Sequence, residues 1–190
     1  MKFIIEHLEK KLYDWCFIEY KHISNIVGKN NLIFTNIKKP KDIKKLKKLG
    51  KVKKESITKI KLKNACLLDP KAKQMLKLKE KFDYFIFGGI LGDFPEKGRT
   101  KKYLASKLKN TEKRNLTKKQ MSTDTAVLAT KLITKGISIN KIKFIDGPTI
   151  TLKKGKFKEE VNLPFRYISK NNKPIISKEL IKYLKNKKGI

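Results

Sequence analysis

The sequence predicts an α/β fold built around a mostly parallel β-sheet. Segments rich in β-branched and aromatic residues alternate along the chain with segments of helical periodicity, which is the pattern of strand–helix–strand units. The strongest strand candidate, Phe82–Ile90, is apolar on both faces, as expected for a strand covered on both sides. Because 190 residues suffice for one sizeable core, we predict a single domain over residues 1–190.

Apolar content and turn signals place the predicted strands. They are Lys2–His7, Leu32–Ile37, Ala65–Leu68, Phe82–Ile90 and Ile142–Asp146. Two further segments, Thr149–Leu152 and Val161–Tyr167, are also expected to be extended. The polar stretch Lys153–Glu160 between them is typical of a hairpin-like excursion rather than a domain linker.

Apolar spacing and end signals place the predicted helices. Leu12–Val27 carries apolar residues close to helical spacing, and Gly28 ends it. Ser122–Lys135 begins at a serine or threonine cap and ends at Gly136. The other predicted helices are Asp42–Leu49, Arg99–Leu108 and Lys178–Lys185.

The chain is strongly basic. Lys and Arg number 49 against 17 acidic residues, for a net charge of +32. A lysine-rich source composition explains part of this excess, whereas thermophilic adaptation would raise Glu together with Lys, which is not seen here. The remaining positive potential favours a polyanionic partner such as the ribosome, rRNA or tRNA. A solvated surface without such a partner is the alternative. The basic segment 38–63 holds 13 lysines and is the first candidate for contact with RNA.

Neither a membrane span nor a metal site is predicted. No run of about 18 apolar residues occurs, and the opening MKFIIEHLEKKL turns to charge too soon for a signal peptide. Cys16 and Cys66 sit in apolar surroundings without CxxC spacing, which indicates buried thiols and a cytoplasmic protein. His7 and His22 lie 15 residues apart with no third ligand at metal-binding spacing.

Acidic residues and glycines gather where the predicted strands end. They are Glu6 with His7, then Asn36, Asp69, Gly88–Asp93 and Asp146–Pro148. Ligands bind at the carboxyl ends of open parallel sheets, although acids and glycines also occur there because strands end in turns. The segment FGGILGD is neither a Walker loop nor a GxGxxG motif. It is compatible with close approach to a nucleotide-like ligand and equally with a tight turn.

Motifs in these same segments resemble the SPOUT-class methyltransferases. They are FIIEHLE (Phe3–Glu9), the Trp15-Cys16 and Glu19-Tyr20 pairs, FTNI (Phe34–Ile37), CLLDPKA (Cys66–Ala72), KFDYFIFGGILGDFPEKGRT (Lys81–Thr100), KKQMSTDTAVLATKLI (Lys118–Ile133), KIKFIDGP (Lys141–Pro148) and LPFRYI (Leu163–Ile168). They run in family order over nearly the whole chain. The family is typified by a eukaryotic enzyme that methylates an arginine of a small-subunit ribosomal protein, and its archaeal relatives are described as probable RNA methyltransferases.

The resemblance implies a deep trefoil knot, made here by residues of about 82–170, and S-adenosylmethionine as the cofactor. The cofactor-binding residues it implies are Gly89, Leu91, Gly92, Met121, Thr123, Ile145, Asp146, Leu163, Pro164 and Phe165. The family is usually richer in arginine after GDFP, whereas this chain reads EKGRTKKYLASK and keeps only Arg99. Many members dimerise through the knot, while the arginine-methylating relative is thought to be a monomer, so both states stay open.

A guanidinium acceptor stays protonated in water, so a carboxylate should hold and deprotonate it during attack. The candidates are Glu6, Asp93 and Asp124. Asp124 also suits the first turn of its helix, and Glu6 could instead pair with a lysine or cap a helix. Arginine is scarce in this chain, which singles out Arg99 and Arg166 as candidate substrate-binding residues. His7 joins them, although a hydrogen-bonded residue at a strand end is the simpler explanation for it.

Three functions remain open from the sequence. Methylation of an arginine in a ribosomal protein is favoured by the resemblance and by the carboxylates at the sheet edge. Methylation of rRNA or tRNA is favoured by the charge. A non-catalytic ribosome-binding factor is the third, and the GGILGD, QMSTDTA and LPFRY segments count against it.

Overall fold

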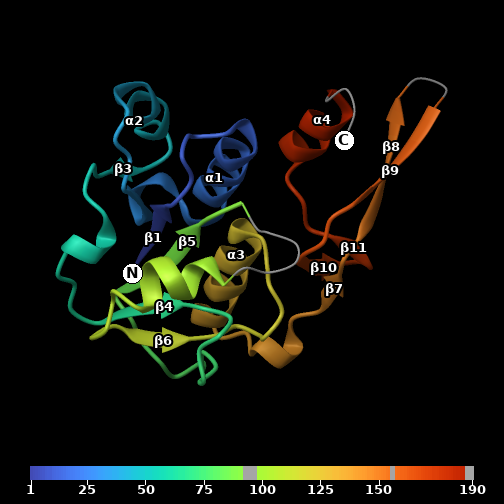
Figure 1. Cartoon of the computed structure of the whole chain (residues 1–190). Coiled ribbons are helices and arrows are strands. Elements are labelled where there is room, and N and C mark those ends of the chain that lie inside the picture. Colours follow the sequence, from blue (N-terminus) through green and yellow to red (C-terminus); the bar gives the residue numbers. More distant parts are fainter. Residues whose placement is uncertain (92–97, 155–156, 187–190) are drawn as a thin grey trace.

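The computed structural model describes residues 1–91, 98–154 and 157–186. Its largest sheet has six strands in the order β3-β2-β1-β5-β4-β6, every neighbouring pair parallel (Figure 1). The strands are β1 (Lys2–His7), β2 (Leu32–Thr35), β3 (Lys51–Val52), β4 (Ala65–Leu68), β5 (Tyr84–Gly89) and β6 (Glu112–Arg114). This arrangement confirms the predicted parallel α/β sheet.

The helices are α1 (Asp14–Val27), α2 (Pro40–Leu46), α3 (Thr123–Thr134) and α4 (Lys178–Asn186). Of these, α1 and α3 lie side by side on one face of the large sheet. The predicted helix Arg99–Leu108 is confirmed with an earlier end: residues 99–105 are helical, and Lys101–Ala105 within them form a π-helical turn. This lysine-rich stretch buries Leu104 and Leu108.

The two edge strands of the large sheet, β3 and β6, were not predicted from the sequence. The sequence of β6 is Glu-Lys-Arg, without an apolar residue, and β3 has two residues. Backbone pairing defines β6: Cys66 lies opposite Glu112, and Leu68 lies opposite Arg114. An edge strand needs few buried side chains, so hydrophobic periodicity cannot reveal it.

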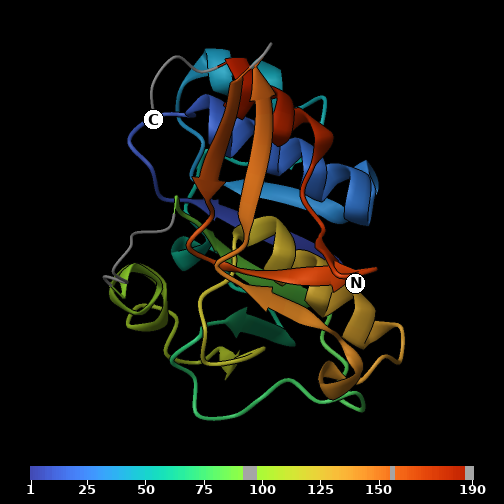
Figure 2. The ribbon, with the colours of Figure 1, turned by 90° about the vertical axis from the view of Figure 1, so that its right-hand side faces the viewer.

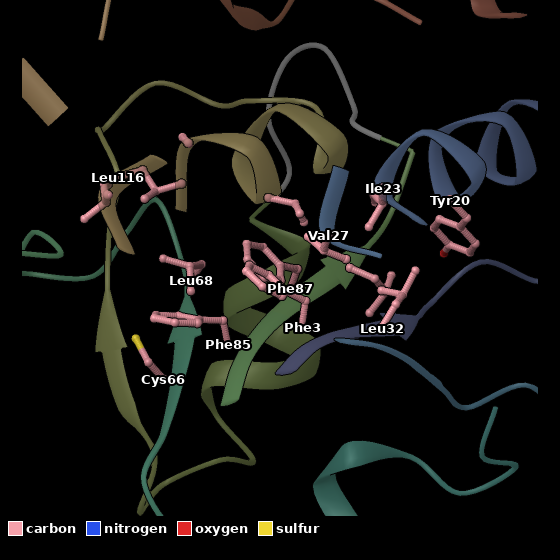
Figure 3. Packing of buried hydrophobic residues seen from close by; sticks show 14 of the residues in the cluster. Phe3, Tyr20, Ile23, Val27, Leu32, Cys66, Leu68, Phe85, Phe87 and Leu116 are labelled. Atoms are coloured by element: carbon pink, nitrogen blue, oxygen red, sulfur yellow. The ribbon is translucent and has the colours of Figure 1, made fainter. Parts of the chain in front are cut away.

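Phenylalanines form the centre of the core between the sheet and the α1–α3 layer (Figure 3). Phe3 stacks on Phe85 and Phe87, with ring centroids 6.0 and 6.3 Å apart. Burying such a side chain contributes roughly 1.5–3 kcal/mol. Cys16 and Cys66 are free and buried, as predicted, and burial raises the pKa of each thiol to about 12.

The C-terminal part forms two small antiparallel sheets outside the parallel one (Figures 1 and 2). One contains β7 (Phe144–Asp146), β10 (Arg166–Lys170) and β11 (Lys173–Pro174), and the other is the hairpin of β8 (Thr149–Lys154) and β9 (Phe157–Asn162). The hairpin confirms the predicted polar excursion and lies beside α4. The expectation that Val161–Tyr167 is continuously extended was wrong. The strand breaks between Asn162 and Arg166, where Pro164 cannot donate a backbone hydrogen bond.

Candidate active site

A pocket opens at the carboxyl ends of β4, β5 and β6. Leu68 and Asp69 line it after β4, and Phe87 and Gly88 line it at the end of β5. Its remaining walls come from segment 98–101 and from the connection that leads from β6 into α3. The apolar wall is completed by Leu116, Met121 and Ala126. This is where an open parallel sheet is expected to bind a ligand.

The two glycines of β5 have different structural roles. A Cβ on Gly88 would lie 3.2 Å from Ile90 Cδ1 and 3.3 Å from Thr100 Oγ1, so a side chain there would crowd the pocket wall. A Cβ on Gly89 would overlap the Tyr20 hydroxyl and lie 2.8 Å from Ile5 Cγ2. Gly89, predicted to bind a cofactor, is therefore required for close packing of α1 on the sheet, and Gly88 is the glycine at the pocket.

The predicted cofactor residues Leu91, Gly92, Met121 and Thr123 have different positions relative to the pocket. Met121 and Thr123 line the pocket, and the Thr123 hydroxyl lies 3.4 Å from the carbonyl oxygen of Gly88, to which it donates. The backbone N–H of Leu91 donates to Glu9 Oε1 at 3.0 Å. Gly92 and Asp93 lie outside the described residues. The start of α3 is thus attached directly to the pocket floor.

The second group of predicted cofactor residues, on the C-terminal side, lies next to the pocket wall. Asp146 Oδ1 accepts a hydrogen bond from Arg166 Nε at 2.6 Å, and its Oδ2 accepts one from Lys119 Nζ at 2.7 Å. Lys119 in turn lines the pocket. These bonds, that from Arg166 above all, hold the pKa of the Asp146 carboxyl well below its usual range. Arg166, predicted to bind substrate, therefore forms a structural ion pair.

The rest of that group packs away from the described lining. Leu163 is buried in a cluster with Tyr167 and residues of α4, and Phe165 packs against this cluster. The backbone N–H of Arg166 donates to the carbonyl oxygen of Gln120, a lining residue, at 2.9 Å. The pocket wall as described contains none of Ile145, Asp146, Leu163, Pro164 and Phe165. Of these residues, Asp146 contacts the connection between β6 and α3, through its hydrogen bond from Lys119.

Two carboxylates, Glu19 on α1 and Asp124 on α3, are buried near the pocket. Asp124 directly follows Thr123, which lines the pocket. Glu19 is 8% exposed and Asp124 is 4% exposed. Trp15 Nε1 donates to Glu19 Oε1 at 3.1 Å. Asp124 accepts from the Ser122 hydroxyl at 2.6 Å, and its Oδ2 lies 2.7 Å from His22 Nδ1. Asp124 therefore links the pocket, through its chain neighbour Thr123, to His22 on α1.

Burial, and then the negative charge of Asp124, raise the pKa of Glu19 well above its ordinary value. Burial also raises the pKa of Tyr167, whose hydroxyl is hydrogen-bonded to Ser122. Two buried acids with one imidazole beside them attract a cation. Sequence analysis missed Glu19 as a site residue. The available signal was its position on the apolar stripe of the predicted helix Leu12–Val27, where a charged side chain needs a partner or a role.

Glu6, predicted as a catalytic carboxylate, has a different environment. It is 1% exposed and accepts three hydrogen bonds: from Thr35 Oγ1 at 2.5 Å, Ser56 Oγ at 2.5 Å and the Ile57 backbone N–H at 2.9 Å. Ile57 begins the short helix Ile57–Lys59. These bonds anchor that helix on the sheet, which is the alternative role considered for Glu6 in the sequence analysis.

The remaining predicted residues are also paired. His7 Nδ1 lies 2.9 Å from the Tyr20 hydroxyl, and burial lowers the pKa of this imidazole, so it is neutral at physiological pH. Arg99 lines the pocket, as expected of a substrate-binding candidate, and its guanidinium is 3.0 Å from Glu9 Oε1. Within residues 1–91, 98–154 and 157–186, no group of three potential ligands could hold a metal ion. The same part of the chain contains no helix long and apolar enough to cross a bilayer.

Comparisons with known proteins agree with this geometry. A family model described as "Protein arginine N-methyltransferase SFM1-like" matches residues 2–189. Protein arginine N-methyltransferase SFM1 of Saccharomyces cerevisiae is 39% identical over 204 residues, which cover 97% of this chain and 94% of the yeast protein.

Solved structures show the same relationship. The crystal structure of the yeast arginine methyltransferase SFM1 complexed with SAM matches with a TM-score of 0.86 and 38% identity, over 97% of this chain and 89% of that one. The complex with SAH gives 0.85 and 37%, over 96% and 94%. The dual-specific Trm10 from Thermococcus kodakaraensis shares the fold, with a TM-score of 0.59 and 17% identity over 74% of this chain and 95% of that one. The SPOUT-type fold implied by the motifs is therefore confirmed, and the chain belongs to the SFM1-like family of protein arginine N-methyltransferases.

Proposed function

We propose that this chain transfers the methyl group of S-adenosylmethionine to an arginine side chain of a ribosomal protein. Family membership supports the reaction, and the SAM and SAH complexes of the yeast relative support the cofactor. The observation that carries the choice of acceptor is the buried pair of Glu19 and Asp124 beside the pocket. A cationic ligand would favour the ionised form of both acids and would account for two carboxyl groups buried side by side.

The described pocket residues fit the cofactor. Leu68, Phe87, Leu116 and Met121 supply apolar walls suited to a flat base. Gly88 leaves open the space that a side chain would fill. When bound, the cofactor supplies an electrophilic methyl group on a sulfonium. Gly92, predicted to bind the cofactor, and Asp93, predicted as a catalytic carboxylate, remain part of this proposal.

The acid pair can hold and deprotonate a guanidinium. A guanidinium keeps its charge throughout the physiological range and offers a planar fork of donors that matches carboxylates. A bound guanidinium favours the ionised form of Glu19, and the carboxylate then takes the proton that the attacking nitrogen loses. Asp124, which accepts from the Ser122 hydroxyl and lies 2.7 Å from His22 Nδ1, offsets the remaining positive charge.

Methylation of RNA is the second candidate, favoured by the charge of the chain. An RNA base has no need of an anionic clamp, so the acid pair counts against it. The decisive experiment incubates the protein with labelled cofactor and ribosomes and then separates RNA from protein. Label on arginine in a ribosomal protein supports the proposal, and label in RNA overturns it. A cofactor titration tests the third candidate, because a non-catalytic ribosome-binding factor would not bind S-adenosylmethionine.

We also infer one domain whose residues 82–170 form a trefoil knot. The chain runs from β6, at the sheet edge, back to α3, which packs on β5. On its way, Asn115 hydrogen-bonds to the β4–β5 connection at Ala72, Gln74 and Leu76. An experimental backbone whose C-terminal segment passes through no loop would contradict the knot. The free buried thiols support action in the cytoplasm.

A further inference from the structure

A second cavity, of about 650 Å³, adjoins the cofactor pocket. It lies between the beginning of the β4–β5 connection, residues 69–74, and the segment 101–114 that contains β6. The two cavities share Asp69, Lys71 and Lys101 in their linings. We call this second cavity the basic groove.

The basic groove carries an excess of positive charge. Its cationic lining residues are Lys71, Lys73, Lys101, Lys109, Lys113 and Arg114, against two acids, Asp69 and Glu112. Both acids are engaged: Asp69 Oδ1 accepts the Lys71 backbone N–H at 3.0 Å, and Glu112 is 2.9 Å from the Arg114 guanidinium. Among the described residues, Lys73, Lys109 and Lys113 form no ion pair. These three ammonium groups are therefore available to a ligand.

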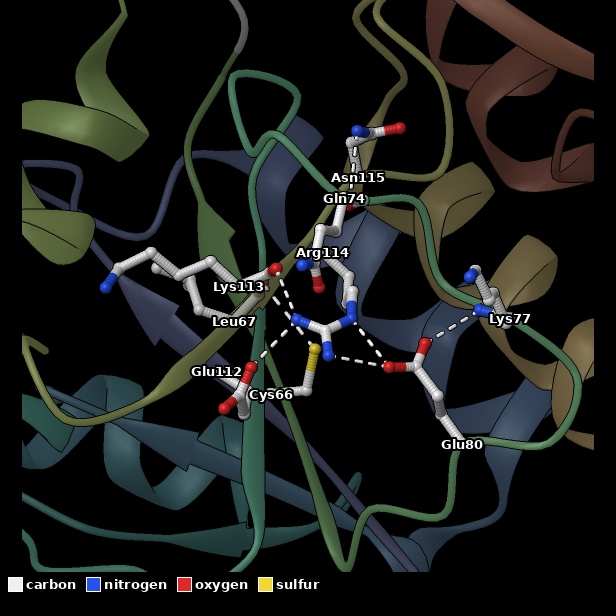
Figure 4. A network of polar contacts seen from close by, with 9 residues as sticks. All are labelled: Cys66, Leu67, Gln74, Lys77, Glu80, Glu112, Lys113, Arg114 and Asn115. Atoms are coloured by element: carbon white, nitrogen blue, oxygen red, sulfur yellow. Dashed lines mark hydrogen bonds and ion pairs between the residues drawn. The ribbon is translucent and has the colours of Figure 1, made fainter.

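The floor of the basic groove is held rigidly (Figure 4). Arg114 is 2.6 Å from Glu80 Oε1 and lies over the Phe82 ring at 5.8 Å from its centroid. The side-chain amide of Asn115 donates to the carbonyl oxygen of Ala72 at 2.8 Å. Figure 4 shows the Lys113 side chain extending away from the Arg114–Glu80 pair. The arginine thus ties the β4–β5 connection to β6, while the ammonium group of Lys113 stays outside that network, although its backbone carbonyl accepts from Arg114.

The side chains that line the basic groove indicate the chemical class of its ligand. Apart from Ala72 and Ala105, every lining side chain is polar or charged, and none is aromatic. Without an aromatic platform the groove cannot stack bases, and ammonium groups suit phosphates. Gln74, Asn110, Thr111 and Ser106 add groups that both donate and accept, as contact with a ribose 2′-hydroxyl requires. We propose that the basic groove binds the sugar–phosphate backbone of RNA, without sequence preference, a binding that does not depend on the proposed methyl transfer.

The test compares two variants of equal charge change. One replaces Lys73, Lys109 and Lys113 with Gln, and the other replaces Lys44, Lys47 and Lys48, exposed residues of the basic segment 38–63. Affinity for an unstructured RNA oligonucleotide is measured by fluorescence anisotropy over a series of salt concentrations. Losing three phosphate contacts should reduce the salt slope by about 2 and the affinity by roughly a hundredfold at 0.1 M salt.

The groove proposal differs from the expectation that the basic segment 38–63 contacts RNA, so the matched variant in that segment should keep the wild-type slope. An equal loss in both variants would assign RNA binding to diffuse charge and overturn the proposal, as would wild-type affinity in the groove variant. A DNA oligonucleotide of the same sequence should bind more weakly, and equal binding would overturn the choice of RNA. Titration with S-adenosylmethionine and thermal unfolding show whether the groove variant is folded. Because the readout is RNA binding, the result is independent of which acceptor is methylated.

Discussion

His22 Nδ1 lies 2.7 Å from Asp124 Oδ2, so a residue of α1 directly orients the carboxylate at the start of α3. The two residues are 102 positions apart in the chain. Thr123, the neighbour of Asp124, lines the cofactor pocket, and Glu19 lies one helical turn before His22. This contact brings the buried acid pair to the pocket and is the basis of the proposed acceptor site.

Replacing Glu19 with Gln keeps the shape of the side chain and removes the base. We expect single-turnover methyl transfer at saturating cofactor to fall by about a hundredfold or more, within the range for a positioned base. Cofactor affinity should stay near that of the wild type. Glu55→Gln, at an exposed residue, is the matched control and should leave the rate of methyl transfer unchanged. A wild-type rate in Glu19→Gln would remove Glu19 from the mechanism.

Glu19 should also make stability depend on pH. Its pKa is raised in the folded state, so the native protein binds more protons than the unfolded chain above the ordinary value of 4.5. The contribution of Glu19 to stability is therefore fully present below that pH and is lost as pH rises through the folded pKa. Chemical denaturation over a pH series should show this decline. The decline should be weaker in Glu19→Gln, and identical profiles for both proteins would contradict the assignment.

The two glycines of β5 should respond differently to substitution. Gly88→Val places a side chain at the pocket wall, so calorimetry should show loss of S-adenosylmethionine binding by a folded protein. Gly89→Ala collides with Tyr20 and Ile5, and it should lower the free energy of unfolding by about 1–3 kcal/mol. The reverse pattern, with binding lost in a stable Gly89→Ala protein, would return Gly89 to the cofactor site.

Glu6→Gln distinguishes anchoring from catalysis. The carboxylate accepts three hydrogen bonds from the segment 56–57 and from Thr35, so its neutralisation should lower the free energy of unfolding by about 2 kcal/mol. Methyl transfer at saturating cofactor should remain within a few-fold of the wild type. A hundredfold loss of transfer in an equally stable protein would restore Glu6 as the base.

Local pattern was enough for the central elements. The apolar runs of β1 and β5 and the periodicity of α1 and α3 each lie within one short segment, so the sequence predicts them with small errors at their ends. Strand ends also marked the correct edge of the sheet, because Asp69 and Gly88 both line the pocket. The polar edge strand β6 could not be recognised in this way, since its pairing with β4 depends on the backbone of a distant segment.

By itself, the sequence determined the parallel α/β class, the family motifs and the edge of the sheet at which the pocket lies. Only the tertiary structure separated the environments of the buried acids, on which their proposed roles depend. Glu6 and Glu19 are both acidic residues within apolar patterns, but Glu6 meets Ser56 and Ile57 whereas Glu19 meets Asp124. The role of a buried carboxylate depends on the groups that surround it in place of water, and here these include Ser56, 50 positions from Glu6, and Asp124, 105 positions from Glu19.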